Sequence, residues 1–163
     1  MINTSIVLQV LAVGLGATIA MDLWRLFLQK FFGVNSLDLG LLGRWVGSLF
    51  RGQIVHRPIG KSPKIKGELA LGWISHYAIG LTFAALLPLL FGKSWLASPS
   101  FMPALAIGLA TVLAPWFIMQ PAMGMGIAAA NAPAPNKVRL RNLAIHTVYG
   151  LGLYASALIL NLK

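Results

Sequence analysis

The chain has 163 residues, of which 58% are hydrophobic and only 10% are charged. A soluble domain carries about 25% charged residues, so this chain lacks the polar surface that would cover a water-exposed globule. Its formal net charge is +10, which in a soluble protein would suggest nucleic acid. Here Lys and Arg stand between apolar runs, so we expect anionic lipids, not nucleic acid, as the counter-charge. The absence of cysteine excludes disulfides, thiolate metal ligands and cysteine nucleophiles.

Four apolar segments are long enough to cross a membrane. A spanning helix needs about 20 mostly apolar residues, because each residue advances about 1.5 Å across about 30 Å of hydrocarbon. The segments are residues 6–31, 69–91, 101–129 and 140–162. No basic residue precedes the first segment, as a cleaved signal peptide would require, so we expect a retained helix. The predicted fold is an all-α membrane protein of one domain, residues 1–163, in which four transmembrane helices form a bundle.

The distribution of basic residues predicts the orientation. Most Lys and Arg residues lie between the first and second spans or between the third and fourth, whereas only Lys93 and Lys163 lie on the opposite side. Because cytoplasmic connections are enriched in Lys and Arg, we expect both long connections in the cytoplasm and both termini outside. Trp45 and Trp95 are then expected at the two membrane interfaces, which indole rings prefer.

Residues 36–66 predict a short interfacial helix followed by a basic loop. Apolar residues recur at a four-residue step: Leu37, Leu41, Trp45 and Leu49. This pattern is typical of an amphipathic helix lying in the membrane interface, and Asn35 or Ser36 would cap its start.

Basic residues within and after this helix predict contact with anionic headgroups. The predicted contacts are Arg44, Arg51, Arg57, Lys61, Lys64 and Lys66. The alternative is that these charges only enforce the topology, and the sequence leaves both interpretations open.

Each span carries one hydrogen-bonding side chain at a similar depth in its cytoplasmic half. The four are Asp22, His76, Gln120 and His146. A charged residue facing lipid would cost several kcal/mol, about 2.5–3.5 on insertion scales, so such residues turn inward and find partners. We therefore expect a polar layer across the bundle.

Three interpretations of this layer remain open. The side chains could only hydrogen-bond across helices, or they could bind or relay a proton, an ion or a small polar solute. In the third, Asp22, His76 and His146 form a two-histidine, one-carboxylate metal site, or the two histidines are axial haem ligands. The second interpretation is favoured. The chain's three acidic residues offer no close carboxylate pair for acid–base catalysis, so a binding or transport protein is favoured over an enzyme.

Glycines near the two histidines fit two of these interpretations. Gly72 and Gly80 flank His76 at four residues on either side, and Gly150 follows His146 by four. They could leave room for a flat macrocycle, or they could allow close helix packing. Packing is also the favoured role of the Gly14–Gly16 and Gly150–Gly152 pairs.

Two prolines interrupt the third predicted span. Pro115 and Pro121 each remove a backbone donor and leave a carbonyl one turn earlier without its partner. A broken helix at membrane depth is tolerated where it lines a cavity or is buried in protein. We therefore expect irregular helical geometry around these prolines.

Several motifs together resemble a family of small bacterial inner-membrane proteins, domain of unknown function 2938. They are Ala20-Met21-Asp22-Leu23-Trp24, His56-Arg57-Pro58 with Ser62-Pro63, Gly67-Glu68 with Gly72-Trp73 and His76-Tyr77-Ala78-Ile79-Gly80, the Pro115 to Gly126 run, and His146 with Tyr149-Gly150-Leu151-Gly152-Leu153-Tyr154. The resemblance covers nearly the whole chain and implies a bacterial inner-membrane location, but no activity. Four spans are few for a complete alternating-access carrier, which favours a homo-oligomer or a partner.

Overall fold

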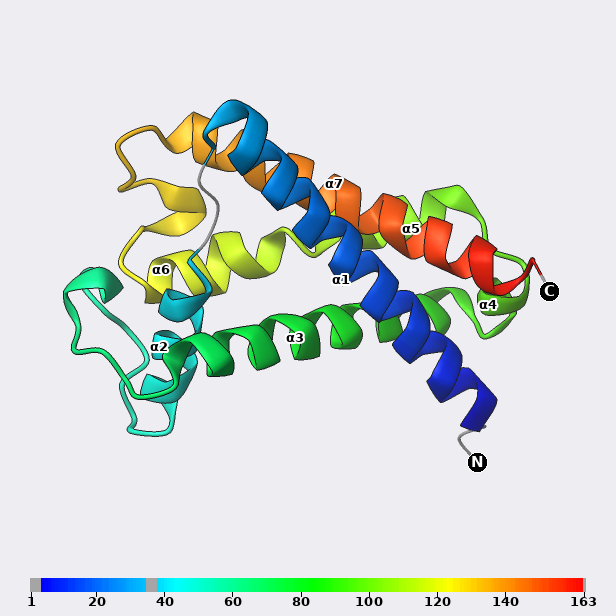
Figure 1. Cartoon of the computed structure of the whole chain (residues 1–163), viewed down its shortest axis with the longest axis horizontal. Helices are drawn as coiled ribbons and strands as arrows, with labels where there is room; N and C mark the ends of the chain where they lie inside the picture. The colour runs from blue at the N-terminus through cyan, green and yellow to red at the C-terminus, as the bar shows by residue number, and fades with distance from the viewer. Residues whose placement is uncertain (1–3, 35–37, 163) are drawn as a thin grey trace. The chain divides into compact units, whose positions relative to one another are not determined.

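The computed structural model covers the whole chain, and the structure describes residues 4–34 and 38–162. Its elements are helical (Figure 1): α1 (Thr4–Phe32), α2 (Leu39–Leu49), the 3₁₀ turn η1 (Ile59–Lys61), α3 (Glu68–Phe91), α4 (Ser94–Ala97), α5 (Phe101–Ala110), the π-helical turn η2 (Pro115–Met119), α6 (Gln120–Ala122), the 3₁₀ turn η3 (Ile127–Ala129) and α7 (Pro135–Leu160). Four helical segments within the described ranges are long and apolar enough to span a membrane. The predicted fold class, with its additional short helix, is confirmed.

The predicted spans agree with the helices at most of their ends. Two differences have local causes. The third span ends at Ala122 rather than near residue 129, because Gly124 and Gly126 adopt φ of +88° and +74° and terminate the helix. The fourth begins at Pro135 rather than near residue 140, since proline is well tolerated in the first helical turn.

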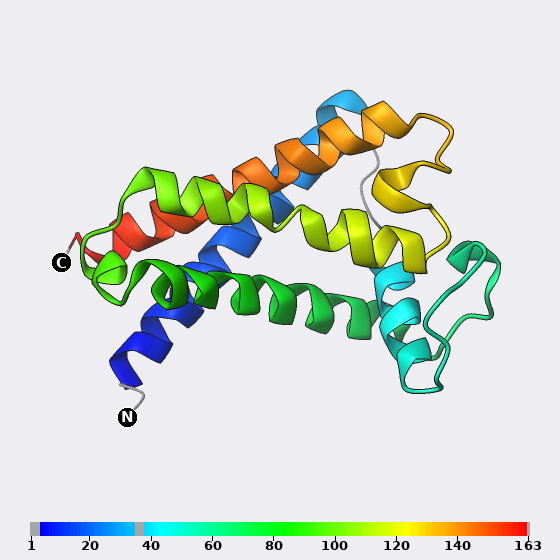
Figure 2. The ribbon, with the colours of Figure 1, turned by 180° about the vertical axis from the view of Figure 1, so that it is seen from behind.

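The third span is irregular, as its prolines predict. α5 ends at Ala110, and the chain continues through a turn into η2 and α6 (Figure 2). The backbone N–H of Gln120 donates to the carbonyl of Pro115, five residues earlier, which is the bonding pattern of a π-helical turn. Pro121 lies in the first turn of α6, where its missing donor is harmless. The prolines therefore place Gln120 at a junction between two helical geometries.

The described chain forms two compact units. The first comprises residues 4–34, 79–111 and 143–162, and the second comprises residues 38–78 and 112–142.

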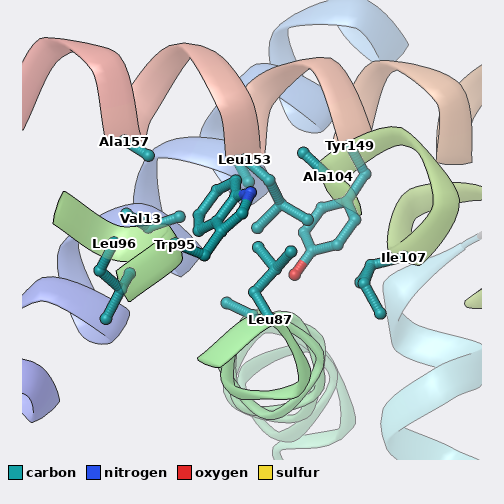
Figure 3. Close-up of a cluster of buried hydrophobic side chains, with 11 residues drawn as sticks. Val13, Leu87, Trp95, Leu96, Ala104, Ile107, Tyr149, Leu153 and Ala157 are labelled. Atoms are coloured by element: carbon teal, nitrogen blue, oxygen red, sulfur yellow. The ribbon is translucent and has the colours of Figure 1, made fainter. Parts of the chain in front are cut away.

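The first unit is a helical bundle with an apolar core. α1, α4, α5 and the later parts of α3 and α7 contribute buried side chains to one cluster, including Val13, Leu87, Trp95, Tyr149 and Leu153 (Figure 3). The hydroxyl of Tyr149 donates to the carbonyl of Gly80 at 2.6 Å, which joins α7 to α3. The ring of Trp95 is buried in this core, and its Nε1 donates to the carbonyl of Ser100; its position at a membrane interface stays a prediction.

Glycines bring the helices of the first unit together, as predicted. A Cβ at Gly14 would lie 2.9 Å from Leu81 Cδ2, and one at Gly152 would lie 2.8 Å from Ala17 Cα. A Cβ at Gly16 would collide with the Ser156 hydroxyl. Such close approaches are possible only because these positions lack a side chain.

The second unit is built around α2. Leu39 and Leu42 of α2 pack with Ile59 and Met123 in a small apolar cluster. Asp38 caps the helix by accepting a hydrogen bond from the Gly40 N–H; the predicted caps Asn35 and Ser36, and Leu37, lie outside the described residues.

The short predicted helix is confirmed, and its glycine side, which was not part of the predicted apolar side, is buried as well. A Cβ at Gly43 would collide with the carbonyl of Glu68, and one at Gly72 with that of Leu39, so α2 presses directly on the first turns of α3. Leu49 and Phe50 stay exposed, the latter at 85%. The apolar side that was expected to meet the membrane interface is therefore only partly exposed: Leu41 and Trp45 are partly buried against the small apolar cluster, whereas Leu49 and Phe50 are exposed.

Candidate functional site

Asp22 forms an ion pair inside the first span. Its Oδ1 accepts a hydrogen bond from Arg25 Nη1 at 2.9 Å, and the two side chains are 13% and 17% exposed. The residues are three apart on α1, a spacing that brings side chains together on one helix face. The predicted inward-facing charge thus has an opposite charge beside it. The sequence analysis did not identify Arg25 as a partner, although the three-residue spacing alone could have indicated the pair.

His146 has a defined tautomer. The hydroxyl of Thr111 lies 2.6 Å from the carbonyl of Gly108 and 2.9 Å from His146 Nδ1. A hydroxyl carries one proton, and the carbonyl can only accept it. Thr111 must therefore accept from the Nδ1–H of His146, which leaves Nε2 as an unprotonated acceptor. Sequence reasoning missed Thr111, because a single threonine in an apolar helix carries no pairing signal.

Gln120 lies in a buried amide cluster. The Asn142 amide satisfies its neighbours in one orientation, in which its oxygen accepts from Gln120 Nε2 at 2.6 Å and from Trp116 Nε1 at 3.2 Å. Its nitrogen then donates to the carbonyl of Val138 at 3.3 Å. This orientation is assigned from the hydrogen-bond network. Gln120 itself is 3% exposed, and its Oε1 is buried without a partner. The cluster therefore holds Gln120 by its nitrogen and leaves its oxygen as an open acceptor.

His76 lies among aromatic rings. Its ring centroid is 6.2 Å from that of Trp73 and 5.5 Å from that of Tyr77, and both contacts are edge-on. The imidazole is half-buried. The distances match those of aromatic packing, so part of the ring surface serves the structure of the second unit.

The glycines beside the histidines are covered by protein. Gly72 abuts Leu39, a Cβ at Gly80 would collide with the Thr18 hydroxyl, and one at Gly150 would lie 3.0 Å from the carbonyl of Ala104. Close packing, one of the two predicted roles, is therefore what these glycines provide, and they do not supply open faces for a macrocycle. Within the described part of the chain, no three His, Asp or Glu side chains are grouped so that they could hold a metal ion.

The predicted layer residues belong to different units. Asp22 and His146 are part of the first unit, and His76 and Gln120 are part of the second. A single layer formed by all four stays a prediction. What the structure adds is the local chemistry of each residue: one paired charge, one packed imidazole, one imidazole hydrogen-bonded to Thr111, and one acceptor without a partner on Gln120.

Arg44 is buried and forms hydrogen bonds both to Glu68 of α3 and to the backbone of the basic connection. The side chain is 5% exposed, and its Nε and Nη2 donate to the two oxygens of Glu68 at 2.8 Å each. Its Nη1 donates to the carbonyls of Ile59 at 3.3 Å and Ser62 at 3.1 Å. The hydrogen bond to Glu68, with its charge, raises the pKa of Arg44 above its ordinary value. Arg44 therefore differs from the prediction: it is buried by internal partners and does not present its charge to headgroups.

The other predicted headgroup residues are exposed: Arg51, Arg57, Lys61, Lys64 and Lys66. No ion pair between any of them and an acidic side chain occurs within residues 4–34 and 38–162. Their contact with headgroups stays a prediction.

The connection itself is a fixed structure. The backbone N–H groups of His56 and Ile59 donate to the carbonyls of Ala122 and Met123 at 2.7 and 3.0 Å. Carbonyls at the end of a helix lack intrahelical partners. The loop supplies the missing hydrogen-bond donors to the carbonyls at the end of the third span. Gly124, with φ of +88°, allows this approach, since a Cβ there would lie 2.6 Å from the carbonyl of His56.

Together, the four apolar helices and their buried polar groups define a multi-pass membrane protein. Residues 11–160 match the family model DUF2938, which is described as a protein of unknown function. The chain belongs to this family. No curated protein and no solved structure matches the chain at a significant level.

Proposed function

We propose that this membrane protein binds or passes a proton or a small polar solute at the level of Asp22, His76, Gln120 and His146. The observation that carries the proposal is the buried, unpartnered Oε1 of Gln120. A buried acceptor without a partner costs about 1–3 kcal/mol, and a residue retained only for helix packing has no reason to keep that cost. A cargo that donates a hydrogen bond would remove it.

His146 supports the same class of cargo. The hydrogen bond to Thr111 holds its proton on Nδ1, so Nε2 also offers a lone pair. Two sites that accept hydrogen bonds favour a proton, or a solute that donates through a hydroxyl or an amide N–H, over an anion. The ion pair between Asp22 and Arg25 leaves little net charge to attract a free cation, which favours a proton or a neutral solute.

We infer that the protein lies in a bacterial cytoplasmic membrane with both termini outside. The bias of Lys and Arg toward the two long connections supports this orientation. In it, the exposed basic residues of the first connection face the anionic leaflet, and the exposed apolar residues Leu49 and Phe50 of the α2 segment lie at its surface. Four spans are few for a carrier, so we further infer a homo-oligomer.

Reconstituted vesicles test the proposed function. Decay of an imposed pH gradient and osmotic swelling by glycerol or urea are measured for the wild type, Gln120→Met and Gln29→Met. Gln120→Met keeps the side-chain volume but removes the acceptor, and Gln29→Met makes the same change at an exposed position of α1. We expect the wild type to accelerate one of these processes and Gln120→Met to slow it at least tenfold, while Gln29→Met has no effect.

Two outcomes would count against the proposal. Vesicles with the wild type could be no more permeable than empty ones, or correctly folded Gln120→Met could be as active as the wild type. Asp22→Asn is a poorer probe, because it would also leave Arg25 without its acidic partner.

A further inference from the structure

A polar pocket lies in the basic connection of the second unit. It has a volume of about 560 Å³ and is lined by residues between Gln53 and Pro63, among them His56, Arg57, Lys61 and Ser62. We call it the 53–63 pocket. None of these residues belongs to the predicted polar layer, so the pocket is a separate feature of the molecule.

The charge of the pocket is positive and uncompensated. Arg57 and Lys61 both line it, and neither forms an ion pair with an acidic side chain in the described residues. Glu68, the acidic residue nearest to them along the chain, has both oxygens bonded to Arg44. The two cations are therefore available to an external anion.

A buried histidine, His56, orients the hydroxyl group of Ser62, which lines the same pocket. His56 is 3% exposed, its Nδ1 lies 2.8 Å from the Ser62 hydroxyl, and its Nε2 is buried without a partner. A buried N–H without an acceptor is rarer than an acceptor without a donor, which favours a proton on Nδ1. His56 then donates to Ser62, and the hydroxyl proton of Ser62 is free to point at a ligand.

The pocket is held in shape before any ligand arrives. Arg44 binds the carbonyls of Ile59 and Ser62, and the backbone of His56 is bonded to the end of α6. The N–H of Ser62 donates to the carbonyl of Ile59 at 3.0 Å. A site whose groups are fixed in advance loses less conformational entropy on binding, so this buried network favours a specific ligand over diffuse contact.

We propose that the 53–63 pocket binds a phosphate group. Arg57 and Lys61 supply the positive charge, the Ser62 hydroxyl donates to a phosphate oxygen, and His56 is the residue that positions this hydroxyl. Arginine and lysine together with a hydroxyl are the donors that recognise phosphate oxygens. The inference narrows the headgroup contact proposed above to one built site and is independent of the polar layer.

The surroundings of the pocket favour a phospholipid as the source of the phosphate. Phe50, Ile54 and Val55 are apolar and at least 57% exposed, and Val55 also lines the pocket. Exposed apolar residues beside a cationic site suit a ligand with acyl chains next to its phosphate. A free phosphate ion would use the polar groups alone.

Lipid binding to the full-length protein tests this proposal. Native mass spectrometry in neutral detergent measures binding of phosphatidic acid, with phosphatidylcholine as the zwitterionic comparison. Arg57→Gln/Lys61→Gln should weaken phosphatidic acid binding at least tenfold. The matched control Arg51→Gln/Lys66→Gln removes the same charge outside the pocket and should change it less than twofold. Ser62→Ala should weaken binding several-fold, and Ser62→Thr should restore it because it returns the hydroxyl.

Competition by inorganic phosphate distinguishes the two sources. If millimolar phosphate leaves phosphatidic acid bound, the site takes a lipid phosphate; if phosphate displaces the lipid and binds alone, it takes a soluble one. Equal losses in the two double variants would overturn the pocket, while headgroup contact by diffuse charge would stand. An unchanged affinity of Ser62→Ala would also overturn it. If the wild type binds phosphatidic acid no better than phosphatidylcholine, both the phosphate-binding pocket and the general contact with anionic headgroups are refuted. The proposal for the polar layer is not affected.

Discussion

Replacing Glu68 by glutamine should destabilise the second unit strongly. The carboxylate of Glu68 accepts two hydrogen bonds of 2.8 Å from Arg44, which is only 5% exposed. Glu68→Gln keeps the shape but removes the negative charge, so a buried guanidinium is left without its ion-pair partner. Removing one partner of a buried ion pair costs about 3–5 kcal/mol. The free energy of unfolding, measured by titration with a denaturing detergent, should fall by that amount.

A double variant separates the effect of the unpaired charge from the effect of losing the hydrogen bonds between Arg44 and the loop. Arg44→Met/Glu68→Leu removes both charges, and replacing a buried pair by apolar residues is often neutral. We expect it to recover most of the stability lost in Glu68→Gln. The carbonyls of Ile59 and Ser62 still lose their donor, so trypsin should cleave the connection after Lys61 faster than in the wild type.

Arg51→Gln is the matched control, because Arg51 is an exposed arginine in the turn that follows the same helix. Its effect should stay within about 0.5 kcal/mol, as is usual for surface substitutions. The reasoning would be refuted if Glu68→Gln cost no more than this control. It would also be refuted if the double variant were less stable than Glu68→Gln, since uncompensated charge would then not be the cause.

Further predictions concern orientation, packing and cofactors. Reporter fusions after Lys64 should give a cytoplasmic signal and fusions after Ser94 an external one; the reverse pattern would overturn the orientation. Gly108→Val should cost at least about 1–3 kcal/mol by overpacking, because a Cβ there would lie 2.5 Å from the α7 backbone; an unchanged thermal midpoint would contradict the close packing. Protein purified from haem-supplemented cells should show no Soret band, because neighbouring residues cover the glycines beside His76 and His146; a band lost on replacing either histidine would revive haem ligation.

The spans could be predicted because their signal is local. Bilayer thickness fixes how many apolar residues a helix needs, and that number can be counted along the chain. The ends were less predictable where backbone geometry decides. Gly124 and Gly126 end the third span, although their neighbours are apolar enough to continue it. The polar first turns of α7 hid its start at Pro135.

Polar partners that lie far apart in the sequence could not be predicted in the same way. Arg44 has the same sequence signature as Arg51, yet one is buried and the other exposed. The difference arises because Gly43 and Gly72 let α2 press on α3, which brings Arg44 to Glu68 across 24 residues of chain. Asn142 likewise gains its role from Gln120 and Trp116, which lie more than 20 residues earlier. Such pairings depend on how the helices pack, and the hydropathy pattern of the sequence does not predict this packing.

Charged and neutral polar groups serve different ends in this protein. The buried charges are matched, Asp22 by Arg25 and Arg44 by Glu68, because an unmatched charge in an apolar surrounding is the most expensive arrangement. A neutral polar group can remain without a hydrogen-bond partner more easily than a charge can. The unpartnered acceptor of Gln120 costs far less folding free energy than an unpaired buried charge would. Ligand binding can therefore be built from neutral groups at small cost to stability. For that reason the unpartnered oxygen of Gln120, rather than the carboxylate of Asp22, is the stronger support for the proposed binding position.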